Sequence, residues 1–520
     1  MSFRHPTSPA AWNHIVASQP QHCAMIAEDG RRWTFAELDL ARIDAARALI
    51  SSGIKAGDRV SIWAQNNAEW VIAGLAIHSI GAALVPINTR MKGAEAGYIL
   101  DKSQAKLLLC TGDFLGQHYP SLLGEHRPAS LTDIIVMCSA REGDTDWASF
   151  IQRGAAISSD EVAQRSAALS ADSVMDIMFT SGTTGKPKGV ITHHGQNLKV
   201  VAEWCDRMAL SPRDNYLIAN PFFHAFGYKV GWLGGLLCGC TILPHAIFDA
   251  AGIIARIAEH QVSVLPGPPT IFISLLDDPA LSGGDFSSLR ATITGAAAVA
   301  PSLIEHVRKD LGFDIVLTGY GLTETCGIVS LCDANDSAET IVSTCGKPVP
   351  ETEVRIVDSD NQPVAQGETG EIVVRGYNVM QGYLDNPAAT AEAIDPDGWF
   401  HTGDVGLLDA SGYIRITDRL KDMYICGGFN CYPAEIENIM AGHPAISQVA
   451  VVGVPDARMG EVGKAFVVAK PGQRIDEAEL ISWCRENMAN YKAPRSIEQI
   501  EALPMNASGK VMKFELRTGS

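Results

Sequence analysis

The chain of 520 residues contains no long hydrophobic run. A membrane-spanning helix needs about 18 or more consecutive apolar residues. The longest near-apolar stretch, residues 68–80, is shorter than this and ends at Gly81. The first residues also lack the apolar core of a secretory signal peptide. We therefore expect a soluble protein without an integral membrane segment, in which residues 68–80 form a buried helix.

Positive charge is scarce in this chain. Lysine and arginine number 41 against 59 aspartates and glutamates, which gives a formal net charge of −18. Nucleic-acid binding needs a basic surface, and anionic membranes attract clusters of basic residues. The composition therefore argues against nucleic acid and against an anionic membrane surface as partners.

Cysteine pairs with metal-binding spacing are also missing. The twelve cysteines include no C-x-x-C pair, and the closest two, Cys238 and Cys240, have no histidine pair with zinc spacing beside them. Scattered cysteines of this kind are typical of buried thiols in a reducing compartment. We expect a cytoplasmic location and no zinc site.

The chain lacks a Walker A loop, but it contains a different run suited to phosphate. Residues 180–189 read Thr-Ser-Gly-Thr-Thr-Gly-Lys-Pro-Lys-Gly and follow an apolar stretch, 174–179, with the length of a strand. A Walker A loop requires G-x-x-x-x-G-K-[ST], whereas only two residues separate Gly182 from Gly185 here. Glycines let the backbone approach a phosphate closely, and hydroxyl, N–H and lysine groups bind its oxygens. The run predicts a nucleotide-phosphate site outside the P-loop class.

This run resembles a motif of the adenylate-forming enzymes, which include acyl-CoA synthetases, adenylation domains and luciferases. Four further segments match the family's motifs in the same order: Tyr320-Gly-Leu-Thr-Glu-Thr325, Gly398-Trp-Phe-His-Thr-Gly-Asp404, Asp418-Arg-Leu-Lys-Asp422 and Pro504-Met-Asn-Ala-Ser-Gly-Lys510. Five motifs in order along nearly the whole chain identify it as a member of this family, in the branch of fatty-acid-type acyl-CoA ligases. The resemblance implies ATP, coenzyme A and a small-molecule carboxylic acid as substrates, with Mg²⁺ as cofactor.

Strand and helix patterns alternate through the first part of the chain. A capping box at Thr34-Phe-Ala-Glu37 predicts a helix that stops at Gly53, and residues 262–265 form one of several short apolar runs expected to be strands. This rhythm predicts an α/β fold with two doubly wound sheets. Shorter alternating strands at about 340–418 predict a small antiparallel β-barrel.

The domain organisation follows from these patterns and from the resemblance. We expect a large AMP-binding domain at 1–418, which includes the barrel, a hinge at 419–421 and a small, mobile α+β C-terminal domain at 422–520. The sequence leaves the oligomeric state open and is compatible with a homodimer.

The resemblance also assigns site residues. In the first motif, the contacts to the ATP phosphates are Thr180, Ser181, Gly182, Thr183, Thr184, Gly185, Lys186 and Lys188. The adenine, ribose and remaining phosphate contacts are Gly295, Ala296, Ala297, Tyr320, Gly321, Asp404 and Arg419, with Tyr320 stacking on the base. The resemblance implies that Thr323 contacts the α-phosphate and that Glu324 and Thr184 bind the magnesium ion. The chemistry agrees, since Mg²⁺ takes one or two carboxylates together with substrate phosphates.

Two half-reactions are implied, and each has its own residues. Lys510 is the expected cation of acyl-adenylate formation, where charge builds up at the α-phosphorus. Lys421 occupies the hinge position of the family. After rotation of the small domain, Gly427 and Gly428 line the pantetheine tunnel through their backbone.

The acyl pocket is expected near Phe222-Phe223-His224, which resembles the aromatic gate beside the carboxylate, with His224 as a catalytic residue. The segment 226–235 forms one wall, and its four glycines are expected to open space in it. This predicts a mainly apolar acid, medium-chain, long-chain or cyclic, and the segment resembles synthetases that activate steroid-ring fragments. Because an unpaired charge is costly in an apolar pocket, we expect Lys229 to turn outward or, alternatively, to meet a polar group of the ligand.

Four other functions stay open at this point. An enzyme that loads a carrier protein, an aromatic-acid CoA ligase and a luciferase-type oxygenase share the adenylation motifs. A non-catalytic nucleotide-binding regulator would be expected to have lost Lys510, Asp404 or Glu324, and all three are present. The identity of the acid is not encoded in these motifs.

Overall fold

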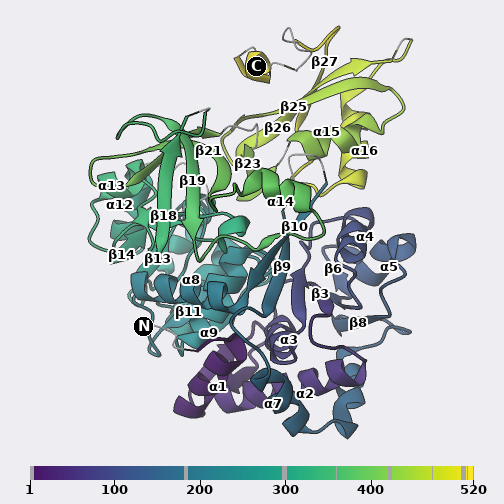
Figure 1. Cartoon of the computed structure of the whole chain (residues 1–520), viewed down its shortest axis with the longest axis vertical. Coiled ribbons are helices and arrows are strands. Elements are labelled where there is room, and N and C mark those ends of the chain that lie inside the picture. The colour runs from purple at the N-terminus through teal and green to yellow at the C-terminus, as the bar shows by residue number, and fades with distance from the viewer. Residues whose placement is uncertain are drawn as a thin grey trace.

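The computed structural model describes residues 5–180, 186–294, 301–358, 360–419, 424–431, 433–470, 472–504, 511 and 513–518. The fold is α/β, as predicted, with a large N-terminal domain and a smaller C-terminal domain gathered at one end of the molecule (Figure 1). No helix within the described residues is both long and apolar enough to cross a membrane.

A seven-stranded sheet forms one layer of the N-terminal domain, in the order β20-β10-β9-β4-β3-β5-β8. The strands β3, β4, β5, β8 and β9 run parallel, and β10 turns back antiparallel to β9. The bounds are β3 Arg59–Trp63, β4 Ala83–Pro86, β5 Leu107–Thr111, β8 Asp133–Cys138, β9 Val174–Thr180, β10 Lys188–His193 and β20 Gly382–Tyr383. Because of this reversal, β9 and β10 form a hairpin. The run at residues 180–189 begins at the end of β9 and extends into the start of β10.

Two helices next to this sheet confirm the sequence analysis. Helix α2 (Phe35–Ser51) begins with the predicted capping box, since the side chains of Thr34 and Glu37 each bind the other residue's backbone N–H. Helix α3 (Ala68–Ser79) is buried along its whole length. An all-round apolar pattern is what such a central helix requires.

A second sheet lies beside the first, in the order β11-β12-β1-β2. Its bounds are β1 Cys23–Ile26, β2 Arg32–Thr34, β11 Asn215–Ile218 and β12 Thr241–Pro244, and a parallel pair, β13 Ala291–Ile293 and β14 Ile315–Leu317, continues it. Val264 joins the two parts through single bridges to Tyr216 and Ala291. The strand expected at residues 262–265 is therefore reduced to one bridging residue.

Antiparallel strands follow, as the short alternating runs at about 340–418 predict. A four-stranded meander contains β18 Thr352–Val357, β19 Gly370–Gly376, β21 Phe400–Leu408 and β22 Ile414–Arg419, and a three-stranded sheet contains β15 Gly319–Tyr320, β16 Ser330–Leu331 and β17 Lys347–Pro348. Two backbone hydrogen bonds link them, from Cys345 N–H to Ile414 O and from Ile414 N–H to Gly346 O.

The C-terminal domain has its own five-stranded sheet and its own apolar core. Its elements are β23 Tyr424–Cys426, β24 Phe429–Cys431, α15 Pro433–Ala441, β25 Ile446–Asp456, β26 Gly460–Ala469, α16 Glu477–Asn487, β27 Ser496–Gln499 and α17 Lys513–Thr518. The remaining helices of four residues or more, apart from two 3₁₀ turns, are α1 Ser8–Ser18, α4 Gly93–Lys102, α5 Tyr119–Leu123, α6 Trp147–Gln152, α7 Ser159–Ala167, α8 His194–Arg207, α9 Gly234–Leu237, α10 Ala250–His260, α11 Pro269–Leu276, α12 Pro301–Asp310, α13 Ala338–Ser343 and α14 Pro387–Ala393.

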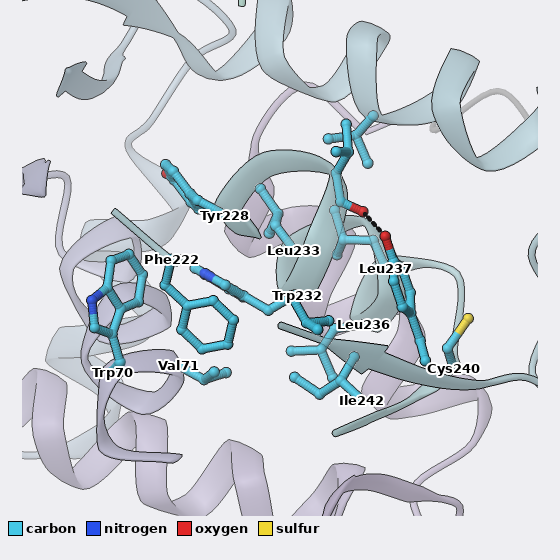
Figure 2. Packing of buried hydrophobic residues seen from close by; sticks show 14 of the residues in the cluster. Trp70, Val71, Phe222, Tyr228, Trp232, Leu233, Leu236, Leu237, Cys240 and Ile242 are labelled. Carbon is cyan, nitrogen blue, oxygen red and sulfur yellow. Dashed lines mark hydrogen bonds between the residues drawn. The ribbon is translucent and has the colours of Figure 1, made fainter. Parts of the chain in front are cut away.

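The segment Phe226–Leu233 forms a π-helix that leads into α9. Such helices are rare and are often found at functional sites. Tyr228 and Trp232 pack into the core, where Trp232 lies 5.8 Å from Trp70 and 5.3 Å from Tyr228 between ring centroids (Figure 2). The π-helix is therefore anchored on one side by large, fully buried rings.

The four glycines of this segment do not open a pocket, so our expectation for them is wrong. A methyl group on Gly227 would lie 2.3 Å from the carbonyl oxygens of Asn220 and Pro221, and one on Gly235 would lie 2.8 Å from the Ile242 side chain. These distances are too short for a side chain. The glycines instead let the π-helix and α9 pack closely against the second sheet.

The expectation for Lys229 also needs correction. Its side chain leaves the pocket wall, but it turns into the protein interior rather than outward to solvent. The Lys229 Nζ lies 3.3 Å from Oδ1 of Asp176 on β9 and donates to Thr192 Oγ1 at 3.2 Å. Thr192 donates in turn to Asp176 at 2.6 Å. A buried cation of this kind is stable because a carboxylate pairs with it.

We expect Lys229→Met to destabilise the protein strongly, because it leaves the Asp176 carboxylate buried without its cation. The free energy of unfolding, measured by urea denaturation, should fall by about 3–5 kcal/mol. The double variant Asp176→Asn/Lys229→Met should recover most of that loss. As the control, Lys199→Met breaks an exposed pair with Glu351 and should cost less than about 1 kcal/mol. Equal losses in the two lysine variants would contradict this role.

Candidate active site

A cavity of about 830 Å³ lies where the two domains meet, and residues of both line it. The predicted site residues in its lining are Thr180, Lys188, His224, Tyr320, Gly321, Thr323, Glu324, Asp404 and Gly428. They come from six separate parts of the chain, and the fold brings them to one space.

The hairpin β9–β10 positions the phosphate-type run. Thr180 ends β9 and Lys188 begins β10, and the two residues are paired in register. The Lys188 Nζ lies 4.7 Å from the ring centroid of Tyr383, a cation–π contact at the cavity wall. Lys186 points elsewhere: it is exposed, and its Nζ lies 5.9 Å from the ring of Tyr98.

Glu324 faces the cavity from the short 3₁₀ helix Thr323–Thr325. Its Oε1 accepts hydrogen bonds from the Tyr383 hydroxyl at 2.9 Å and from Thr180 Oγ1 at 3.4 Å. Burial raises the pKa of the Glu324 carboxyl, although Tyr383, Thr180 and the charge of Lys188 oppose that rise. A carboxylate held among hydroxyl oxygens suits a hard cation such as Mg²⁺.

Tyr320 and Asp404 form a second pair in the cavity. The Tyr320 hydroxyl donates to Asp404 Oδ2 at 2.6 Å, and Asp404 is only 7% exposed. Tyr320 ends β15 and Asp404 lies within β21, so the antiparallel region supplies both. Arg419 is paired in register with Asp404 at the end of β22.

His224 reaches the cavity just before the π-helix. Its Nδ1 accepts a hydrogen bond from the backbone N–H of Phe226 at 3.3 Å. The surrounding protein desolvates the ring and lowers its pKa, so the imidazole is neutral at pH 7. Because Nδ1 accepts that bond, the neutral ring carries its proton on Nε2 and can donate a hydrogen bond from there.

The C-terminal domain contributes the hairpin turn between β23 and β24. Gly427 and Gly428 have φ angles of +56° and +84°, a backbone conformation that favours glycine. A methyl group on Gly428 would lie 3.5 Å from Pro268 of the N-terminal domain. Gly428 therefore lines the cavity directly, whereas Gly427 packs against Met459 and does not.

The other predicted site residues lie outside the described residues. They are Ser181, Gly182, Thr183, Thr184, Gly185, Gly295, Ala296, Ala297, Lys421 and Lys510. Their roles stay predictions from the sequence.

The sequence analysis missed several residues that line the cavity. Tyr383 is the clearest, because it belongs to a two-residue strand with no periodicity, and only the pairing of β20 with β10 brings it to Glu324. The lining also includes apolar side chains, which are Trp204, Phe226, Val230, Ile328, Leu331 and Ile341, and the rings of Trp204 and Phe226 are in contact. Phe226 and Val230 belong to the predicted wall segment, while the others come from α8 and from the region around β16 and α13.

Comparison with known proteins gives the family. The AMP-binding enzyme family matches residues 12–384, and the AMP-binding enzyme C-terminal domain matches residues 435–510. A 3-[(3aS,4S,7aS)-7a-methyl-1,5-dioxo-octahydro-1H-inden-4-yl]propanoyl:CoA ligase of Mycobacterium tuberculosis is 49% identical, with 98% of each chain covered. A ligase of the same name from Rhodococcus jostii is 46% identical, with 99% of each chain covered.

A solved structure agrees with these matches. The o-succinylbenzoate-CoA synthetase of Bacillus subtilis, a double mutant bound to a product analogue, is 29% identical, with a TM-score of 0.80 over 98% of each chain. The chain therefore belongs to the AMP-binding enzyme family and is an ATP-dependent acyl-CoA synthetase, an acid–thiol ligase that releases AMP and pyrophosphate.

Proposed function

We propose that the acid activated by this synthetase is bulky, mainly apolar and built on fused rings. The observation that carries this is the apolar cavity wall formed by Trp204, Phe226, Val230 and their neighbours. Two relatives that match 98–99% of the chain are named for a propanoate attached to a methylated two-ring dione. The Trp204 and Phe226 rings, which meet edge to face at 5.8 Å between centroids, and the branched side chain of Val230 offer an apolar surface that suits such a ring system.

We propose a two-step reaction in this cavity. A carboxylate oxygen of the acid attacks the α-phosphorus of ATP, and the bond from that phosphorus to pyrophosphate breaks. The thiol of CoA then loses its proton and attacks the acyl carbon, and the bond from that carbon to AMP breaks. His224 lines the cavity and is the described side chain best suited to orient the acid, by donating a hydrogen bond from Nε2.

The nucleotide roles are proposed from the cavity geometry. Tyr320 would stack on adenine and Asp404 would accept hydrogen bonds from the ribose hydroxyls, while Thr323 would contact the α-phosphate. Glu324 would hold Mg²⁺ beside the hydroxyl of Thr180, and the ion would neutralise charge on the phosphate oxygens. The two hydroxyl groups that contact Glu324, those of Thr180 and Tyr383, support this assignment.

We also propose that residues 1–418 and 422–520 move relative to one another about a hinge at 419–421. Gly428 lines the cavity in the present arrangement, which is the arrangement expected for the CoA step. Lys510 would replace it in the adenylation step.

All twelve cysteines are free thiols, which supports a reducing, cytoplasmic location, and we retain a homodimer as the proposed assembly.

The acid preference tests the proposed substrate class. The wild-type enzyme should have a higher kcat/KM for a bicyclic dione propanoate than for acetate, propionate or a cinnamate-type acid, measured by pyrophosphate release with CoA present. The larger side chain of Val230→Phe should narrow the cavity and lower kcat/KM for the bicyclic acid by about tenfold or more. The loss of kcat/KM for hexanoate should be much smaller. A preference for acetate or propionate would refute the proposal.

Gly428→Leu should block the CoA step and spare adenylation. The new side chain would enter the cavity beside Pro268, whereas pyrophosphate release from acid and ATP does not need that space. As a matched control, Gly412→Leu places the same side chain at φ +82° with no heavy atom within 4 Å. A loss of thioester formation in both variants would show that backbone strain, and not the blocked cavity, is the cause.

Lys510→Ala should produce the opposite result. Loss of the cation should slow acyl-adenylate formation by about 10²–10³-fold, while CoA transfer from supplied acyl-adenylate should stay near the wild-type rate. Single-turnover measurements of the two half-reactions separate these effects. Equal losses in both would place Lys510 outside the proposed role.

A further inference from the structure

A buried ammonium joins the two domains at the edge of the cavity. The Lys492 Nζ lies 2.7 Å from Oε1 of Glu95 on α4 and 2.7 Å from Oε1 of Glu435 on α15. The three side chains are 2%, 11% and 5% exposed, in the order Lys492, Glu95, Glu435. One lysine of the C-terminal domain is therefore shared between a carboxylate of its own domain and one of the N-terminal domain.

A second interaction, within its own helix, fixes the Glu95 carboxylate. Its Oε2 accepts the backbone N–H of Lys92 at 2.9 Å, which caps the N-terminus of α4, and its Oε1 is left to bind Lys492. Burial alone would lower the pKa of Lys492, but its interactions with Tyr491, Glu95 and Glu435 raise it well above its ordinary value. Glu95 and Glu435 thus hold the ammonium between the two domains.

A second contact lies next to the first and leads to the glycine hairpin. The Asn88 Nδ2 donates to the Tyr491 hydroxyl at 3.1 Å. The Tyr491 ring stacks on Phe429, with 4.5 Å between centroids and 25° between planes. Phe429 directly follows Gly428, so the position of Tyr491 and Lys492 is transmitted to the turn that lines the cavity.

We propose that Glu95 is a positioning residue for the thioester-forming step: it holds Lys492 and so seats the Gly427–Gly428 turn against the cavity. This inference rests on the two-step function proposed above. A buried ion pair adds little net stability over solvated charges, but its geometry is specific. Because Glu95 and Lys492 belong to different domains, their contact stabilises the arrangement that places the turn in the cavity.

Glu95→Gln is the first test, because glutamine keeps the helix cap and loses the charge. Adenylation, measured as acid-dependent pyrophosphate release without CoA, should stay within about twofold of wild type. The transfer of the acyl group from preformed acyl-adenylate to CoA should slow at least tenfold. Glu37→Gln is the matched control, since Glu37 caps α2 in the same way and touches no interdomain partner among the described contacts; it should leave both rates unchanged.

Two further variants guard against a folding defect. Asn88→Ala removes the neighbouring contact to Tyr491 and should slow the CoA step selectively, by a smaller factor. The effects of Glu95→Gln and Lys492→Met on the CoA step should not add in the double variant, because both remove one interaction. If each variant only destabilised its own domain, the two effects on the CoA step would add.

The outcomes distinguish this role from the proposed function. If the wild type forms acyl-CoA and Glu95→Gln slows both half-reactions equally or neither, the positioning role is wrong and the proposed function stands. If the wild type forms acyl-adenylate from the ring acid but transfers nothing to CoA, the two-step function fails, and the role of Glu95 with it.

Discussion

The buried ion pair between Lys229 and Asp176 connects the two halves of the site. Asp176 lies on β9, the strand that leads into the phosphate-type run, and Lys229 lies on the π-helix whose Phe226 and Val230 face the cavity. Because an unpaired charge at this depth is costly, the strand and the π-helix are held at one separation. The proposed acid and nucleotide sites would thus share one internal ion pair between the strand and the π-helix.

Much of the fold could be predicted from local patterns. The Thr34–Glu37 capping box and the apolar run at 68–80 each predicted a helix that the structure contains, because both signals act over a few neighbouring residues. The strand expected at 262–265 is reduced to the bridging residue Val264, although Ser263 and Leu265 also donate backbone hydrogen bonds to Asn215 and Ala291 on either side.

The site could be located from motifs, but its internal contacts could not. Thr180, Tyr320, Glu324 and Asp404 line one cavity, as the family resemblance led us to expect. The partners that fix them, such as Tyr383 beside Glu324, come from distant segments without any local signal. Glycines misled us in the same way, since sequence alone does not reveal whether a missing side chain makes room for a ligand or for a neighbouring strand.

The sharing of one cavity by two domains has a consequence for the reaction intermediate. In the proposed reaction the acyl-adenylate is a mixed anhydride that water can cleave, and the cavity lining from both domains would shield it. The proposed movement of the C-terminal domain would expose it briefly to solvent. On that proposal, the contacts around Gly428 and Lys492 would affect how much ATP is lost to hydrolysis, in addition to how fast the thioester forms.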